Sequence, residues 1–193
     1  MSDIFPDIFQ ISQRYALPLA LILLALVFII FLNRRKIRHG WLNLKTRRRL
    51  KRLGVKQIAN FKCPDGLGHH YIIDRLILRP DGISLLLFKR YPGKIFCADK
   101  IDHWTQMLGQ KSYRFDNPLY DLECQVKAVS VCIPNVPVDG YLFFDHLSEF
   151  PKGHPDRVFH LKNIPPFLLP DKKDKVDALV KDGWEKLLQM AKS

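Results

Sequence analysis

The sequence lacks the residue patterns that mark several common classes of enzyme. Its four cysteines form no C-x-x-C pair, which argues against a zinc ribbon or a thioredoxin-like site. Its seven histidines form neither H-x-x-x-H nor H-E-x-x-H, and no serine lies in a G-x-S-x-G context. We therefore expect neither zinc-protease nor serine-hydrolase chemistry, and we predict that the cysteines are reduced, small core residues of a cytoplasmic domain.

Charge is missing from the 19 residues between Arg14 and Arg34, which are mostly apolar. As a helix this run is about 28 Å long, close to the thickness of a bilayer's hydrocarbon core. A signal peptide would begin with positive charge and end at a small-residue cleavage site, whereas here two acids precede the run and "NRRKIRHG" follows it. The sequence predicts a short extracytoplasmic N-terminus over 1–14 and a membrane-spanning helix over 15–33, and a buried core helix is the plain alternative.

Acidic residues are absent from residues 34–56, where eleven basic residues stand. The positive-inside rule places this side of the span, and the rest of the chain, in the cytoplasm of a single-pass inner-membrane protein. The stretch "WLNLKTRRRLKRLGV" predicts a basic amphipathic helix against anionic lipid headgroups. Its apolar residues are Trp41, Leu42, Leu44, Leu50 and Leu53. The residues expected to bind are Arg34, Arg35, Lys36, Arg47, Arg48, Arg49 and Arg52. Nucleic-acid phosphates would attract the same cations, and a solvated connector helix is the simpler reading.

The remainder of the chain is nearly neutral. Of the formal charge of +12, the first 33 residues contribute −1 and residues 34–56 contribute +11, which leaves +2 for residues 57–193. Strong basic character therefore belongs to the juxtamembrane segment alone. We expect a folded domain over 57–170 and a C-terminal amphipathic helix over 171–193.

The order of apolar segments predicts an α/β domain with a mixed sheet and flanking helices. "YIIDRLIL" and "ISLLLFKR" read as strands around the turn "RPDG", and "PGKIFCAD", "VDGYLFFD" and "RVFHL" as further strands. A helix is expected to begin at Asn117-Pro118. The apolar face of the last helix is predicted to comprise Val176, Leu179, Val180, Leu187 and Leu188.

The first hairpin brings a carboxylate and an ammonium group together. With residues 79–82 as the turn, Asp74 stands opposite Leu87, and alternation places both on one face with Lys89. Ile73 and Phe88 are expected on the other face. Taken alone, Asp74 would be the partner of Lys89 or Arg75 in an ordinary ion pair.

Several motifs, in this order, resemble the NERD (nuclease-related domain) family over roughly residues 45–170. They are "IIDRLIL" with Asp74, "PDGISLLLFK" ending in Lys89, "RYPGKI", "DHW", "FDNPLYDLECQ" and "VPVDGYLFFD". The resemblance implies a restriction-endonuclease-like fold of the PD-(D/E)xK type, a bacterial source and magnesium-dependent cleavage of DNA.

The sequence departs from the family pattern where the metal would bind. In the family, the aspartate and the glutamate of E-x-K hold the metal, and the lysine steadies the attacked phosphate or the water. Asp74 and Lys89 match these positions, but Leu87 stands in place of the glutamate. The glutamine of N-P-x-x-Q falls on Asp121, with Gln125 one helical turn later.

A single carboxylate holds magnesium poorly, so we expect no bound metal, no cofactor and little or no catalysis. The sequence then predicts a binding or scaffold module that engages nucleic acid or a protein partner at the membrane. Two alternatives stay open. Asp121, Asp99 or Asp102 could supply the second ligand of a magnesium-dependent nuclease, or the groove could be the vestige of a structural membrane protein.

Overall fold

A computed structural model describes residues 23–24, 28–34, 46, 48–66, 68–171 and 173–191. The chain divides into two units, Met1–Arg48 and Arg49–Ser193. In the first unit, residues 23–24 and 28–34 are helical, and their large apolar side chains are exposed. Residues 1–14 and most of the predicted span lie outside the described residues. Within the described part of the chain, no helix has the length and apolar character that a membrane crossing needs.

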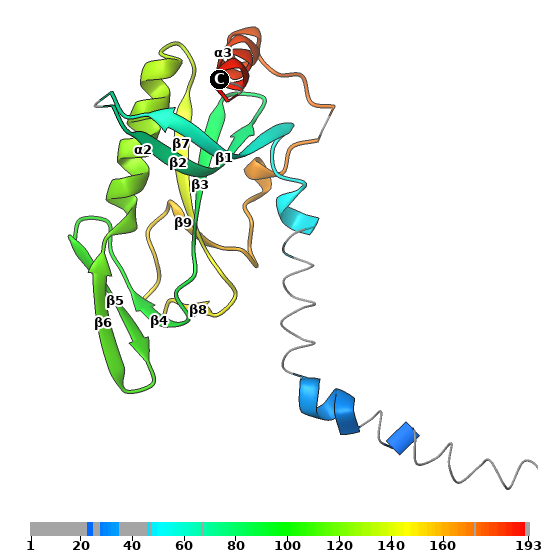
Figure 1. The fold of residues 1–193 in the computed structure, drawn as a ribbon, viewed down its shortest axis with the longest axis vertical. Coiled ribbons are helices and arrows are strands. Elements are labelled where there is room, and N and C mark those ends of the chain that lie inside the picture. Colours follow the sequence, from blue (N-terminus) through cyan, green and yellow to red (C-terminus); the bar gives the residue numbers. More distant parts are fainter. Residues whose placement is uncertain are drawn as a thin grey trace, which may run out of the picture. The chain divides into compact units, whose positions relative to one another are not determined.

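The second unit is a mixed α/β domain with two sheets (Figure 1). The larger sheet has the order β1-β2-β3-β7-β9 and the smaller one β6-β5-β4-β8. The strands are β1 (Lys56–Pro64), β2 (His70–Leu78), β3 (Ile83–Lys89), β4 (Gly93–Phe96), β5 (His103–Leu108), β6 (Lys111–Asp116), β7 (Val138–Phe144), β8 (Ser148–Glu149) and β9 (Val158–His160). The helices are α2 (Pro118–Cys132), the 3-10 helix η1 (Pro166–Leu168) and α3 (Ala178–Met190). The predicted class is confirmed, but as two sheets instead of one.

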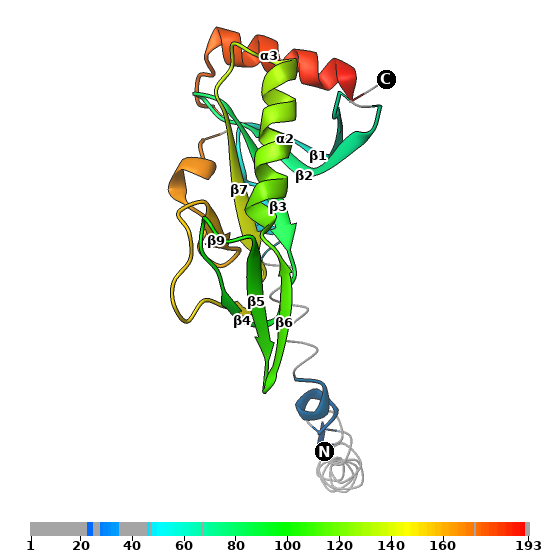
Figure 2. The ribbon, with the colours of Figure 1, turned by 90° about the vertical axis from the view of Figure 1, so that its left-hand side faces the viewer.

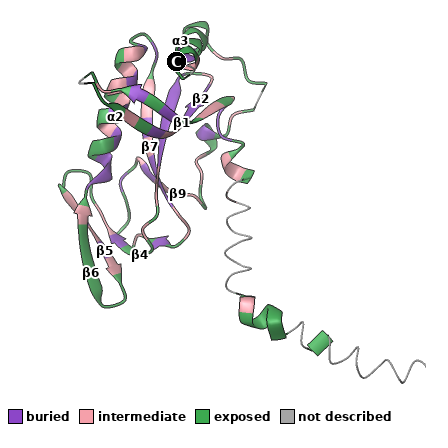
Figure 3. Ribbon diagram, in the orientation of Figure 1, coloured by how far each residue is buried: buried purple, intermediate pink, exposed green. Residues whose placement is uncertain are grey.

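Helix α2 begins where the sequence predicts. The Asn117 side chain caps it by accepting the Leu119 N–H at 3.0 Å, and Pro118 takes the first position, where an N–H is not needed. The helix packs against β7 and turns Leu119, Leu122 and Val129 into the core (Figure 2). Buried residues concentrate in the central strands (Figure 3).

Helix α3 covers the same core with a face that differs from the predicted one. Asp177 caps it by accepting the Leu179 N–H at 2.8 Å, and its buried residues are Val180, Gly183, Trp184 and Leu187. Leu179 was expected on this face but is 60% exposed. The reason is angular: one step along a helix is about 100°, so a face centred on residues 180, 184 and 187 turns its neighbour at 179 to solvent.

The opposite face of the larger sheet has its own apolar cluster, comprising Leu53, Ile77, Leu86, Phe143 and Leu168. Leu53 was expected to face lipid, but it is fully buried in the domain. The Gly54 N–H donates to the Leu168 carbonyl at 3.0 Å, which fixes the end of the basic segment to the sheet. This segment therefore leaves the helical pattern before β1 begins.

A local break in β1 alters which side chains share a face. Asn60 has a φ of 51°, and the β1–β2 ladder runs through Ala59↔Arg75 and Phe61↔Ile73 without a pair between Asn60 and Asp74. The break runs across both strands at this level, because Ile73 and Leu76 are three residues apart on β2 and yet both lie in the core cluster that contains Phe61. The prediction that Ile73 faces away from this core was therefore wrong.

Gly140 on β7 is expected to tolerate no larger residue, because α2 passes directly over it. An added Cβ would lie 2.6 Å from Val126 Cγ2 and 2.9 Å from Leu122 Cδ1. Gly140→Ala should lower the free energy of unfolding by about 1–3 kcal/mol through overpacking. Urea unfolding of the full chain in mild detergent, followed by the emission of buried Trp104 and Trp184, measures this. Val131→Ala is the control, because Val131 is 80% exposed on α2 and its side chain is free of the core. An equal or smaller effect at Gly140 would contradict the close contact.

Candidate functional site

The site begins where β2 and β3 separate. Their ladder runs from Leu78↔Ile83 to Arg75↔Leu86, as the sequence predicts, and ends there. Beyond Arg75↔Leu86, the side chain of Asp74 takes the place of a backbone acceptor on β2. Its Oδ2 accepts the Phe88 N–H at 2.7 Å. Asp74 therefore joins the two diverging strands, and its carboxylate is already engaged by the backbone.

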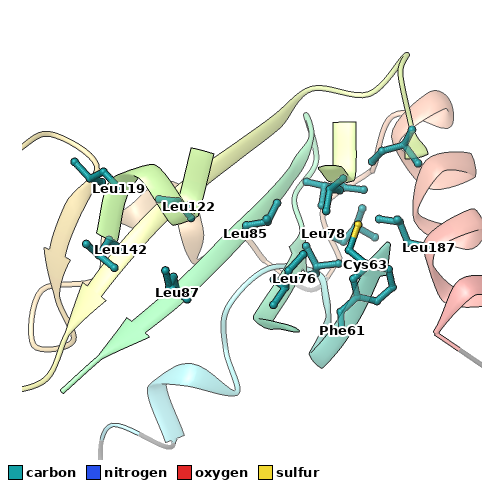
Figure 4. Packing of buried hydrophobic residues seen from close by; sticks show 14 of the residues in the cluster. Phe61, Cys63, Leu76, Leu78, Leu85, Leu87, Leu119, Leu122, Leu142 and Leu187 are labelled. Atoms are coloured by element: carbon teal, nitrogen blue, oxygen red, sulfur yellow. The ribbon is translucent and has the colours of Figure 1, made fainter. Parts of the chain in front are cut away.

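Leu87 occupies the position opposite Asp74 on β3 and is only 7% exposed. It is paired with Leu142 across the parallel β3–β7 ladder. Leu119 and Leu122 of α2 belong to the same apolar cluster, and Figure 4 shows them around Leu87 on its side of the sheet. The second carboxylate of a nuclease site would have to lie in this apolar contact.

Lys89 ends β3 and is half-buried. It is paired with Phe144 of β7, which is paired in turn with His160 of β9, so the three residues form a row at the carboxyl ends of parallel strands. Among the described residues no carboxylate lies within 4.0 Å of the Lys89 ammonium group. The expected ion pair with Asp74 is therefore not formed, because that carboxylate is turned toward the β3 backbone.

The other acids considered as ligands lie at the surface. Asp121 is exposed on α2, whereas Gln125, one turn later, is 8% exposed and its Oε1 has no hydrogen-bond partner in the described part of the chain. Asp99 and Asp102 are exposed before β5, and Asp102 accepts the Tyr120 hydroxyl at 3.2 Å. Among the described residues there is no group of three His, Cys, Asp or Glu side chains placed to hold a metal.

The donor set at the strand separation does not fit a divalent metal. Asp74 offers one carboxylate that already accepts a backbone N–H, and Leu87 offers only carbon. Next to Asp74, the Arg75 guanidinium donates through Nη1 to Gln57 Oε1. Burial lowers the pKa of Arg75, and the nearby Asp74 carboxylate opposes this shift. The polar groups here support one another and leave no free anionic pair.

Sequence reasoning missed His160. Burial lowers the pKa of this histidine, and a hydrogen bond with the Asp145 backbone opposes the shift. Its ring lies 4.9 Å from the Phe150 ring, centroid to centroid, and its Nδ1 is buried without a partner in the described structure. The only signal in the sequence is one histidine at the end of the short strand "RVFH", which is too weak to single out.

A groove of about 1020 Å³ lies elsewhere on the domain. It follows β1 and is closed by the start of β2 and by Met190 and Ala191 at the end of α3. Lys62, His69 and His70 line it, and no acid does among the residues that the structure describes. Asp74, Leu87 and Lys89 take no part in it. No sequence pattern indicates this groove, because it arises from the approach of α3 to an edge strand.

Comparison with known proteins gives one match. The model of the nuclease-related domain family, NERD, matches residues 40–145, which include β1 to β7 and α2. No curated protein and no solved structure matches the chain.

Substitution of Asp74 tests its role at the strand separation. Asp74→Ala leaves the Phe88 N–H without its acceptor and should lower the free energy of unfolding by about 1–3 kcal/mol. Asp74→Asn keeps an oxygen acceptor and should recover most of this loss. Urea unfolding of the full chain measures both variants. Equal losses in the two variants would show that the negative charge, and not the hydrogen bond, is what matters there.

His160 should make the stability of the domain depend on pH. Its pKa is lower in the folded state than the usual 6.5, so the unfolded chain binds the proton more readily and stability falls as the pH drops below about 6.5. His160→Phe should reduce this dependence between pH 7 and pH 5, measured by urea unfolding at each pH. The exposed His69→Gln is the control. An unchanged pH dependence in His160→Phe would contradict the assignment.

Proposed function

Because this chain belongs to the nuclease-related domain family, we propose that it is a binding module that has kept the family's restriction-endonuclease-like arrangement and lost its metal-dependent chemistry. The observation that carries this proposal is Leu87, which is packed into the core at the position of the metal-binding glutamate. Asp74 and Lys89 then serve the fold or a ligand, and no magnesium is needed.

The loss of chemistry follows from what magnesium requires. The ion gives up its water reluctantly and is commonly held by one or two carboxylates together with substrate phosphate. In phosphodiester hydrolysis it must also fix the attacking water and the leaving oxygen. One carboxylate bonded to a backbone N–H, beside leucine methyl groups, supports neither requirement.

We propose that the module is tethered to the inner membrane of a bacterium by a single span over 15–33, with its N-terminus outside and residues 57–193 in the cytoplasm. The uncharged run and the eleven cations after it support this orientation. In the described helical residues 28–32 the apolar side chains are exposed, as those of a lipid-facing helix would be. Anionic headgroups are the proposed partners of the cations in residues 34–56.

The groove along β1 favours a protein partner over nucleic acid for the domain itself. β1 is an edge strand, and an extended peptide can add to such an edge through backbone hydrogen bonds. Lys62 and the two histidines favour an acidic peptide. A charge of only +2 over residues 57–193 gives weak attraction for a DNA duplex, so any nucleic-acid binding would depend on the basic segment.

The second candidate is a nuclease with a rearranged site. It would require Asp121, Asp99 or Asp102 to move toward Asp74 and bind magnesium with it. The observation in its favour is Gln125 on α2, the helix that begins at the N-P-x-x-Q motif. Its Oε1 is buried and has no hydrogen-bond partner among the described residues.

Mn²⁺ binding by the natural protein and by a variant with a restored carboxylate separates these candidates. In titration calorimetry of the full chain in detergent, we expect no tight Mn²⁺ site in the natural protein and a measurable one in Leu87→Glu, which places a second carboxylate opposite Asp74. Leu87→Gln has the same shape without the charge and should bind no metal. Tight Mn²⁺ binding by the natural protein that Asp74→Ala removes, together with nicking of plasmid DNA in magnesium, would instead establish the nuclease.

A further inference from the structure

We propose that the domain meets the bilayer through a defined surface, the entry face, which comprises residues 49–54 and 161–171. On this face Phe167 and Leu169 insert into the interfacial region of an anionic membrane. The inference rests on the proposed tether and adds to it the part of the folded domain that contacts lipid.

The two segments of the entry face are held together, although more than a hundred residues separate them. The Gly54 N–H donates to the Leu168 carbonyl at 3.0 Å, and Arg49 Nη1 donates to the Lys162 carbonyl at 2.5 Å. Leu53 and Leu168 are both fully buried in the cluster on that side of the sheet. Figure 1 shows η1 beside the segment that leads into β1. The entry face is therefore one surface of the domain.

The apolar residues of η1 and its flanks differ in burial. Leu168 is buried, whereas Phe167 is 46% exposed and Leu169 is 39% exposed. The Phe167 ring is held in place, because it lies 5.3 Å from the Tyr141 ring and the Arg79 guanidinium lies 5.8 Å from its centre. The sequence "IPPFLLP" places prolines around both residues and stiffens the backbone. An exposed aromatic ring and leucine on a rigid support match the interfacial layer of a membrane.

Exposed cations belong to the same two segments and to the residues that follow them. Lys51, Arg52, Lys162, Lys173 and Lys175 are all exposed on or next to the entry face. Of the neighbouring acids, Asp171 and Asp174 accept backbone N–H groups of their own loop, from Lys173 at 3.1 Å and from Asp171 at 2.9 Å. Asp81 and Asp139 pair with Arg79 at 3.3 and 2.9 Å, beside the Phe167 ring. With Arg49 and Arg79 the described cations here number seven against four acids, so an excess of three positive charges favours anionic lipid over a neutral surface.

Chain connection keeps the entry face within reach of the bilayer. The predicted span ends at residue 33, 16 residues before Arg49. Sixteen residues cover about 24 Å as a helix and at most roughly 55 Å when extended. The β5–β6 hairpin also exposes an aromatic residue, Tyr113, at 46%, but no chain connection draws it to the membrane. Tyr113 is therefore the matched control.

The test uses the full chain in vesicles of phosphatidylcholine and phosphatidylglycerol whose acyl chains carry bromine. Trp41→Phe gives a background in which Trp104 and Trp184 are buried. In this background we expect bromolipid to quench the fluorescence of the tryptophan added by Phe167→Trp. Leu169→Trp is a second probe with the same expected result. The fluorescence of the tryptophan added by Tyr113→Trp should stay unchanged. Omission of phosphatidylglycerol should weaken the quenching of the first two.

Flotation of the same vesicles keeps the two proposals apart. A chain that does not float with the vesicles overturns the tether. A chain that floats while the tryptophans of Phe167→Trp and Leu169→Trp are quenched no more than that of Tyr113→Trp overturns the entry face and leaves the tether standing. Quenching that is equal in neutral and anionic vesicles overturns the role of charge. A Phe167→Trp probe that responds to added DNA and not to lipid would assign the face to nucleic acid instead.

Discussion

The domain depends on one hydrogen bond, from the Phe88 N–H to the Asp74 carboxylate, at the point where β2 and β3 stop pairing. Below that point the two strands form a regular antiparallel ladder. Above it β3 continues alone beside β7, with which it pairs as far as Lys89. An aspartate accepts a backbone N–H with charge assistance and can replace the lost ladder bond within the same length of chain. Asp74 is therefore a structural element of the sheet.

The residue opposite Asp74, Leu87, is apolar and packed in the core. Leu87 continues the row of Leu85 toward α2, so the core extends to the position where a metal site would require water and charge. The aspartate and lysine of the family pattern are present, yet the carboxylate serves the backbone and the ammonium group has no carboxylate within 4.0 Å among the described residues. On the proposed function, Asp74 and Lys89 are retained from the family pattern while leucine replaces its second carboxylate.

The sequence predicts well the features that depend on local chemistry. The turn at residues 79–82, the register of Leu78 with Ile83 and the start of α2 at Asn117-Pro118 follow from proline, glycine and capping preferences, and all three are confirmed. The faces of Ile73 and Leu179 were predicted wrongly, because one depends on the left-handed Asn60 across the ladder and the other on where α3 settles. β6 has few apolar residues and pairs with β5 alone in its sheet. Its strand conformation therefore depends on hydrogen bonding to β5 and not on its own hydrophobic pattern. Alternation in the hairpin singled out Asp74 and Lys89, and family resemblance supplied their expected role. The bond from the Phe88 N–H to Asp74 could come only from three-dimensional geometry.

The exposed edge of β1 has a consequence for how copies of this protein meet each other. Sheets extend readily when two edge strands align, and a nine-residue strand is long enough to do so. β1 carries Lys56 and Lys62 and no acid, so an antiparallel pair of copies centred on Ala59 would set lysine against lysine at both ends. Glu185 of α3 lies 3.7 Å from the Lys56 ammonium group and offsets part of this repulsion. Like charges oppose such self-association and leave the edge open. The two lysines thus disfavour aggregation through this edge.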